Sequence, residues 1–106
     1  YVQAQRVRAE FRRAVEEAIE GFDVLLTPAT PAPAPRDVTT TGDPMFQSPW
    51  TTAGIPAVPL PSGLSESGLP LGIELAAAPF AERTLLSSGR WCEEVLDVSL
   101  TPPIAE

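Results

Sequence analysis

Serine is the side chain best suited to nucleophilic chemistry in this sequence, and one serine lies close to a known nucleophile motif. Residues 63–67, Gly-Leu-Ser-Glu-Ser, approach the Gly-x-Ser-x-Gly turn that presents a nucleophilic serine between a strand and a helix. Ser67 stands where the motif requires its second glycine, and the sequence contains no histidine that could act as the base. We therefore interpret residues 63–67 as a surface turn.

Metal binding and thiol chemistry have few candidate residues. With one cysteine and no histidine, the sequence lacks the ligands that zinc prefers. Glu93, Glu94 and Asp97 could hold a hard cation through oxygen, but they equally fit a solvated helix face, which we favour. Cys92 lies on the apolar side of the predicted helix beside two glutamates, so we expect a buried, protonated thiol. The sequence therefore predicts neither a metal nor a cofactor.

The two tryptophans are the strongest candidates for large apolar contacts. Trp91 lies within a predicted helix, where we expect it to pack against the core. Trp50 lies just before a Gly-Ile-Pro turn at residues 54–56, and loop aromatics commonly wall ligand pockets. Trp50 is therefore a candidate for a substrate contact.

A predicted helix over residues 3–20 is the first element of the scaffold, because apolar residues recur there every three or four positions. Arg12–Glu16 and Arg13–Glu17 are expected to pair one turn apart. Gly21 suits the position that ends the helix. No capping residue precedes the helix and the chain opens without methionine, so we expect the helix and the native protein to begin upstream. The apolar stripe consists of Val7, Phe11, Ala14, Val15, Ala18 and Ile19.

Short apolar runs predict the strands. Residues 22–27 predict a buried strand that Pro28 stops. Residues 57–60 predict a strand that lies at an edge of the sheet or points Pro59 and Pro61 away from a neighbour, because these prolines have no amide hydrogen to donate. The sum is a mixed α/β or α+β layer. The other expected elements are loops over 27–35 and 36–44, a short helix or turn over 45–53, a turn over 62–70, a strand over 71–76, a helix over 81–97 with Leu85, Leu86, Cys92, Val95 and Leu96 on one face, and a frayed tail from Ser99.

Charge and composition exclude several classes of partner. Fourteen acidic residues against seven arginines give a formal charge of −7, which disfavours direct binding to nucleic acid and to anionic membranes. No apolar stretch approaches the roughly 20 residues that span a bilayer. A single cysteine allows no internal disulfide and is compatible with the cytoplasmic location that we expect.

Thirteen prolines punctuate the chain, and the alternating Pro-Ala run at residues 31–35 invites comparison with ligands of SH3-type domains. Arg36 would supply the flanking cation of such a ligand. Proline-rich recognition usually occurs in unstructured tails, so we favour an ordered loop here. A free-standing proline-rich adaptor is kept as a minor hypothesis.

Five segments occur in the order and at the spacing found in one family of enzymes. Together they resemble the C-terminal segment of the amidase-signature hydrolases, over about residues 1–97. Glu74 replaces the common glutamine of the family, and Thr51-Thr52 stands where many relatives carry an asparagine. The five segments are Asp23–Pro28 (DVLLTP), Thr52–Ala57 (TAGIPA), Val58–Gly63 (VPLPSG), Gly68–Leu75 (GLPLGIEL) and Phe80–Leu86 (FAERTLL).

The resemblance implies an α/β fold, namely the C-terminal part of an α/β/α sandwich with a mixed sheet and flanking helices, incomplete on its own. Residues 1–97 would form this part of the domain and residues 98–106 a tail. The family transfers an acyl group with two serines and a lysine, and backbone amides stabilise the oxyanion. This sequence contains no lysine and no match to the serine loop. The resemblance therefore places the catalytic residues upstream, assigns none here, and predicts that this chain alone is inactive.

The implied partners are the N-terminal catalytic part of the same protein and a small amide substrate, with a homo-oligomer left open. The implied activity is hydrolysis of a carboxylic amide, or release of ammonia for transfer. The loops Pro28–Arg36 and Gln47–Gly54 are expected to line the acyl or leaving-group pocket, with Trp50 and Thr52 as substrate-binding residues. Because lysine is missing, the alternative is a non-catalytic binding or structural module derived from an amidase tail.

Overall fold

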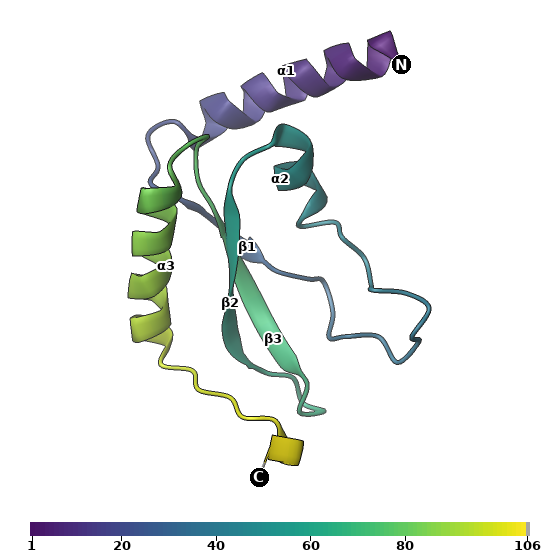
Figure 1. Ribbon diagram of the computed structural model, residues 1–106, viewed down its shortest axis with the longest axis vertical. Coiled ribbons are helices and arrows are strands. Elements are labelled where there is room, and N and C mark those ends of the chain that lie inside the picture. The colour runs from purple at the N-terminus through teal and green to yellow at the C-terminus, as the bar shows by residue number, and fades with distance from the viewer. Residues whose placement is uncertain (106) are drawn as a thin grey trace.

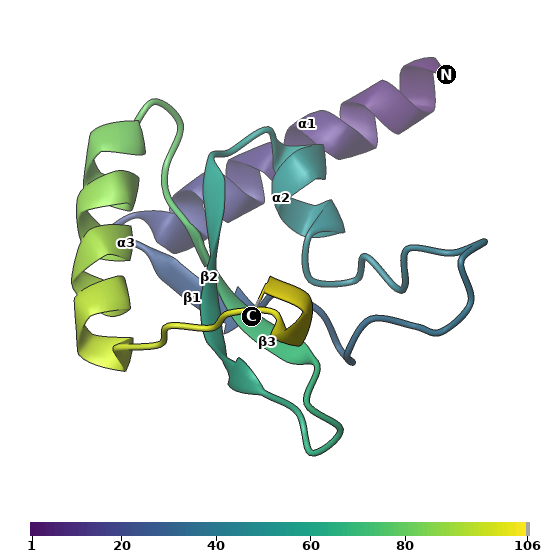
Figure 2. The same cartoon turned by 60° about the horizontal axis from the view of Figure 1, so that its bottom comes forward.

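The computed structural model describes residues 1–105 and shows a small sheet between helices (Figure 1). Strands β2 and β3 form a hairpin, helix α3 follows them, and helices α1 and α2 lie at the other side of the strands (Figure 2). The elements are α1 (Val2–Ile19), β1 (Leu25–Pro28), α2 (Ser48–Ala53), β2 (Ala57–Leu64), β3 (Pro70–Ala76), α3 (Glu82–Leu96) and a 3-10 helix (Pro103–Ala105).

The three strands are ordered β1-β3-β2, and both pairings are antiparallel. Strand β3 is therefore central, and β1 and β2 run parallel to each other on its two sides. The predicted edge position of the proline-containing strand is confirmed, because within this sheet β2 has β3 as its single neighbour. A register shift between Pro61 and Gly63 lets β2 continue to Leu64, further than the sequence predicted.

The two faces of β3 pack into two apolar clusters, because successive side chains of a strand point to opposite faces. The α2-side cluster contains Ala76 together with residues of α1, α2 and the following turn, and the α3-side cluster contains Leu75. The α2-side cluster is Ile19, Ala53, Ile55 and Ala76, and the α3-side cluster is Leu75, Ala77 and Leu85.

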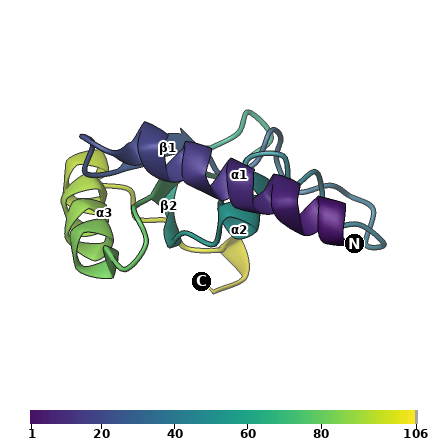
Figure 3. The same ribbon diagram turned by 90° about the horizontal axis from the view of Figure 1, so that it is seen from above.

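Helix α1 confirms the predicted helix, but only the end of its apolar stripe is buried. Ile19 is buried and Val15 is half-buried, whereas Val7 is exposed and Phe11 lies at the limit of exposure. The reason is position: the N-terminal half of α1 extends away from the strands (Figure 3). Arg12 pairs with Glu16 at 2.9 Å as predicted. Arg13 instead donates to the carbonyl of Ala9 at 3.4 Å.

Strand β1 begins three residues later than predicted. Gly21 has a φ of +89°, and the amide of Phe22 donates to the carbonyl of Ile19, so the helix-ending turn uses residues expected in the strand. Phe22 is consequently 66% exposed. The expectation of a buried strand also fails at Leu26, which is exposed at the edge of the sheet, and Pro28 is the last residue of the strand rather than its stop.

The second half of the chain contains one confirmation and two further corrections. The short helix or turn predicted over residues 45–53 is confirmed as helix α2, with Gly54 as its left-handed cap. Helix α3 buries Leu85 and Gly89, and Leu86 and Val95 are exposed instead of sharing the buried face. The tail ends in a 3-10 helix rather than fraying throughout, and residue 106 lies outside the described residues. Within residues 1–105, no helix is both long enough and apolar enough to cross a lipid bilayer.

The glycines Gly54 and Gly89 provide a matched pair of stability tests. Gly54 has a φ of +73°, so Gly54→Ala forces a side chain into the left-handed region and should cost about 1 kcal/mol. Gly89 has ordinary helical geometry, and a new Cβ would lie 3.6 Å from Val58 Cγ1, so Gly89→Ala should stabilise α3 by about 0.5–1 kcal/mol. Thermal midpoints of the two variants should therefore move in opposite directions; equal shifts would contradict the cap geometry.

Candidate functional site

The face of the sheet that packs against α2 carries two polar side chains opposite each other. Thr27 of β1 and Glu74 of β3 are register partners, next to the pair Leu25 and Ala76 on the same face. Cβ atoms of directly opposed residues lie about 4.5–5.5 Å apart. Thr27 Oγ1 and Glu74 Oε2 are both buried, and neither has a hydrogen-bond partner among residues 1–105.

Glu74 is the buried charged residue of the described chain, with 8% of its surface exposed. Burial raises the pKa of the Glu74 carboxyl above its ordinary value, because the charged form loses hydration. On the neighbouring strand β2, the register partner of Glu74 is Pro59, which is exposed and has no side-chain hydrogen-bond donor. The carboxyl group is thus buried at the centre of the sheet, and the surface over β2 beside it is open.

Trp50 lies on the same side of the sheet as this polar pair. Its indole ring is half-buried and packs against the α2-side cluster. The indole Nε1 is fully buried and finds no acceptor within the described part of the chain. Three buried polar atoms without hydrogen-bond partners therefore lie on the same side of the sheet. Buried polar groups in proteins are normally hydrogen-bonded, so this arrangement is unusual.

Thr52 lies on a different surface from Trp50, because residues two positions apart point to opposite sides of a helix. Its carbonyl accepts a hydrogen bond from Arg8 Nε at 3.0 Å. Its side chain is exposed and lines a groove of about 750 Å³ between α1 and α2, which we call the α1–α2 groove. Val7, Phe11 and Met45 make most of that groove apolar. The structure therefore does not bring Trp50 and Thr52 together.

The proline-rich segment Pro28–Arg36 forms a loop along the sheet. It borders a groove of about 650 Å³, the proline groove, whose other wall is the β2–β3 hairpin, and Thr27 lines this groove. The continuing loop is ordered by local hydrogen bonds, such as Thr30 Oγ1 to the carbonyl of Ala32 at 2.8 Å and Thr39 Oγ1 to Asp37 Oδ1 at 2.7 Å. Thr27 is thus one of the residues that line the proline groove, although its hydroxyl oxygen is buried.

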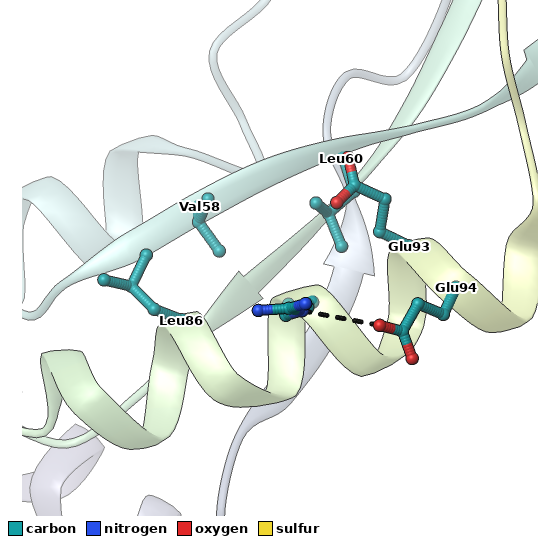
Figure 4. A pocket seen from close by; sticks show the side chains of 7 residues that line it. Val58, Leu60, Leu86, Glu93 and Glu94 are labelled. Carbon is teal, nitrogen blue, oxygen red and sulfur yellow. Dashed lines mark hydrogen bonds and ion pairs between the residues drawn. The ribbon is translucent and has the colours of Figure 1, made fainter.

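A separate cavity of about 560 Å³ lies between α3 and β2 (Figure 4). Val58 and Leu60 face α3 across it, and Arg90 pairs with Glu94 at 3.4 Å on the helix. Both members of this pair are well exposed, so the pair contributes little to stability. The cavity offers charge but no nucleophile. No group of three potential metal ligands occurs among residues 1–105.

The structure also tests the predictions made from the sequence for Ser65, Cys92 and Trp91. Ser65 lies in a turn that joins two strands, with its Oγ 3.0 Å from Ser67 Oγ. The interpretation of residues 63–67 as a turn is therefore confirmed for residues 65–67, whereas Gly63 and Leu64 end β2. Cys92 packs against the α3-side cluster but is half-buried rather than buried. Trp91 is 65% exposed, so the prediction that it packs in the core was wrong.

The sequence and the arrangement of helices around this antiparallel hairpin can both be compared with those of known protein families. The chain belongs to the amidase family, whose family model matches residues 1–86. It is similar to a structure described as an amidase, with a TM-score of 0.80 and 28% identity over 90% of this chain and 24% of that one. It is also similar to a glutamyl-tRNA(Gln) amidotransferase subunit from Thermotoga maritima, with a TM-score of 0.72 and 28% identity over 87% of this chain and 22% of that one.

Relatives with curated descriptions point to the same family. A glutamyl-tRNA(Gln) amidotransferase subunit from Zymomonas mobilis is 41% identical over an alignment of 101 positions, which covers 89% of this chain and 20% of that protein. The subunit of the same name from Moorella thermoacetica is 44% identical over an alignment of 95 positions, which covers 83% of this chain and 19% of that protein. The chain thus spans about a fifth of the length of these relatives, and it corresponds to part of an amidase-type protein.

Proposed function

We propose that this chain is the C-terminal part of an amidase that hydrolyses a carboxylic amide by acyl transfer through two serines and a lysine. The observation that carries the proposal is the likeness of 90% of the chain to about a quarter of an amidase structure. Because the sequence contains no lysine, the proposed nucleophile, relay serine and base belong to an upstream part. We place the complete protein in the cytoplasm.

The role proposed for this chain is to complete the fold and to form one wall of the substrate site. The proline groove and the region around α2 supply that wall. Trp50 and Thr52 lie on different faces of α2, so each is proposed as a separate contact to the substrate or to its leaving group. Several relatives are named as amidotransferase subunits, so the ammonia released could be transferred to a second acceptor. Direct binding of nucleic acid to this acidic chain is not proposed.

The test is ammonia release from primary amides by the protein made from the complete coding sequence, with residues 1–106 alone as the control. We expect activity in the complete protein and none in the control. The non-catalytic alternative predicts that the upstream coding sequence has no glycine- and serine-rich loop and no lysine, and that the complete protein releases no ammonia from any amide. Either finding would replace the enzymatic proposal by that of a binding or structural module.

A Trp50→Ala substitution in the complete enzyme tests the proposed contact. We expect KM or the preference among amides to change about tenfold, because the removal of a large aromatic surface from a binding site costs on the order of 1–3 kcal/mol. Trp91→Ala is the matched control, because Trp91 is exposed on α3, on the other side of the sheet. Kinetics that stay unchanged across several amides, in a variant with normal thermal stability, would exclude Trp50 from the site.

A further inference from the structure

The Glu74 carboxyl has no counter-charge within the described residues, although many charged residues occur nearby in the sequence. Strands β1 and β2 and helix α2, which pack around β3 on this side, contain no charged residue. Of the four arginines of α1, Arg8 binds the carbonyl of Thr52, Arg12 binds Glu16, and Arg13 binds the carbonyl of Ala9. The fourth, Arg6, is exposed on the half of α1 that extends away from the strands. The buried acid is therefore left without the pairing that buried charges normally require.

The loop between β1 and α2 adds three charged residues, and none of them compensates Glu74. Arg36, Asp37 and Asp43 are all exposed. Asp37 accepts hydrogen bonds from Thr39, and Asp43 accepts one from the amide of Met45. A partner for Glu74 must then come from outside the 105 described residues.

The surroundings of Glu74 specify what such a partner must offer. An ionised carboxylate accepts hydrogen bonds, and the adjacent Thr27 hydroxyl can accept one as well. Ala57, Pro59 and Pro61 of β2 are exposed, so an approach to this face over β2 is not covered by the chain. On the opposite side, Thr27 borders the proline groove. The site suits a group with several N–H donors and a positive charge.

We propose that Glu74 and Thr27 form a recognition site for an ammonium or guanidinium group. The group donates one hydrogen bond to Glu74 and one to Thr27, and its charge compensates the buried carboxylate. Because burial raises the pKa of Glu74, protons compete with the cation for the carboxylate, and binding strengthens as the pH rises through that pKa. The cation is carried either by the substrate or by an arginine or lysine in the rest of the protein, and the two sources give different results in one experiment.

The substrate source is tested with a pair of amides that differ in one group, and this arm depends on the proposed function. The complete enzyme is assayed with 4-aminobutanamide and with pentanamide, in which a methyl group replaces the ammonium. If the substrate supplies the cation, Glu74→Gln should lower kcat/KM for 4-aminobutanamide relative to pentanamide by about tenfold or more, the loss expected for a charge-assisted hydrogen bond. Glu66→Gln, at an exposed acid in the β2–β3 turn, should leave the ratio unchanged.

The second possible source of the cation, an arginine or lysine of the protein itself, is tested by thermal stability, a measurement that requires no enzymatic activity. If an arginine or lysine of the protein occupies the site, the ratio of the two amides is the same in Glu74→Gln and in the parent. The thermal midpoint of the complete protein then falls in Glu74→Gln and in Thr27→Val, but not in Glu66→Gln. Failure to hydrolyse pentanamide would count against the proposed amidase function alone, because this stability measurement would still report on the site.

One result overturns the recognition site altogether. An unpaired Glu74 has a raised pKa in the folded state, so its contribution to stability is complete at low pH and is lost as the pH rises through that value. If the complete protein shows this loss as the pH rises through the raised pKa, if Glu74→Gln abolishes it, and if the ratio of the two amides is unchanged, then Glu74 is a bare buried acid. No cation then binds there.

Discussion

Replacing Leu75 by alanine should lower the free energy of unfolding by about 2–5 kcal/mol. Leu75 is 1% exposed and lies on β3, the strand that pairs with both neighbours. It joins the sheet to α3 through the α3-side cluster with Leu85. The truncation therefore leaves a cavity at the junction of two layers, where backbone pairing on both sides prevents the strand from moving to fill it.

The measurement is the urea midpoint of the complete protein, followed by the fluorescence of its tryptophans. Leu64→Ala is the matched control, because Leu64 ends β2 and is largely exposed, and it should shift the midpoint little. Similar losses at both positions would mean that β3 is not the centre of the core.

Residues 1–106 produced alone should associate into oligomers or aggregate. The α1–α2 groove exposes Val7, Phe11 and Met45, and the outer edge of β1 offers an unpaired strand with Leu26 exposed. Apolar patches and open strand edges of this kind promote association. Relatives about five times as long as this chain contain further sequence that could cover such surfaces.

Light scattering coupled to size-exclusion chromatography would measure the association, and co-expression with the upstream part would test its cause. We expect large or mixed species for the isolated chain and a single defined species for the co-expressed parts. A Phe11→Glu change should reduce association of the isolated chain, whereas Val38→Glu, in the exposed loop, should not. A monomer that melts cooperatively would show that the exposed surfaces are tolerated.

The elements of this fold that are local in sequence are predicted well. The spacing of apolar residues from Val7 to Ile19 and the glycine after them define α1 within one residue at each end. Pro59 and Pro61 favour an edge strand, because a proline within a sheet has no amide hydrogen to donate to a neighbouring strand. The prediction fails at Phe22, which the sequence pattern places at the start of the strand. The amide of Phe22 instead donates to the carbonyl of Ile19 in the turn after α1, so the strand begins later.

The burial of individual side chains is predicted less well, because burial depends on what lies opposite. Trp91 and Val95 are apolar residues of the kind found in protein cores, yet both are exposed. Helix α3 instead packs against the sheet through Leu85 and the small Gly89. The sequence also does not predict the polar pair. Glu74 stands out as an unusual residue in its segment, but its position opposite Thr27 follows from the β1–β3 register, which joins distant parts of the sequence.

The strand order has a consequence for how the chain folds during synthesis. Strand β1 leaves the ribosome early, but its partner β3 follows only after the proline-rich loop, α2 and β2 have been made. The β2–β3 hairpin and α3 are contiguous and can form as a unit, since local contacts close quickly. Until that unit exists, β1 lacks its partner strand β3, and the prolines after β1 limit its extension into a longer aggregation-prone segment.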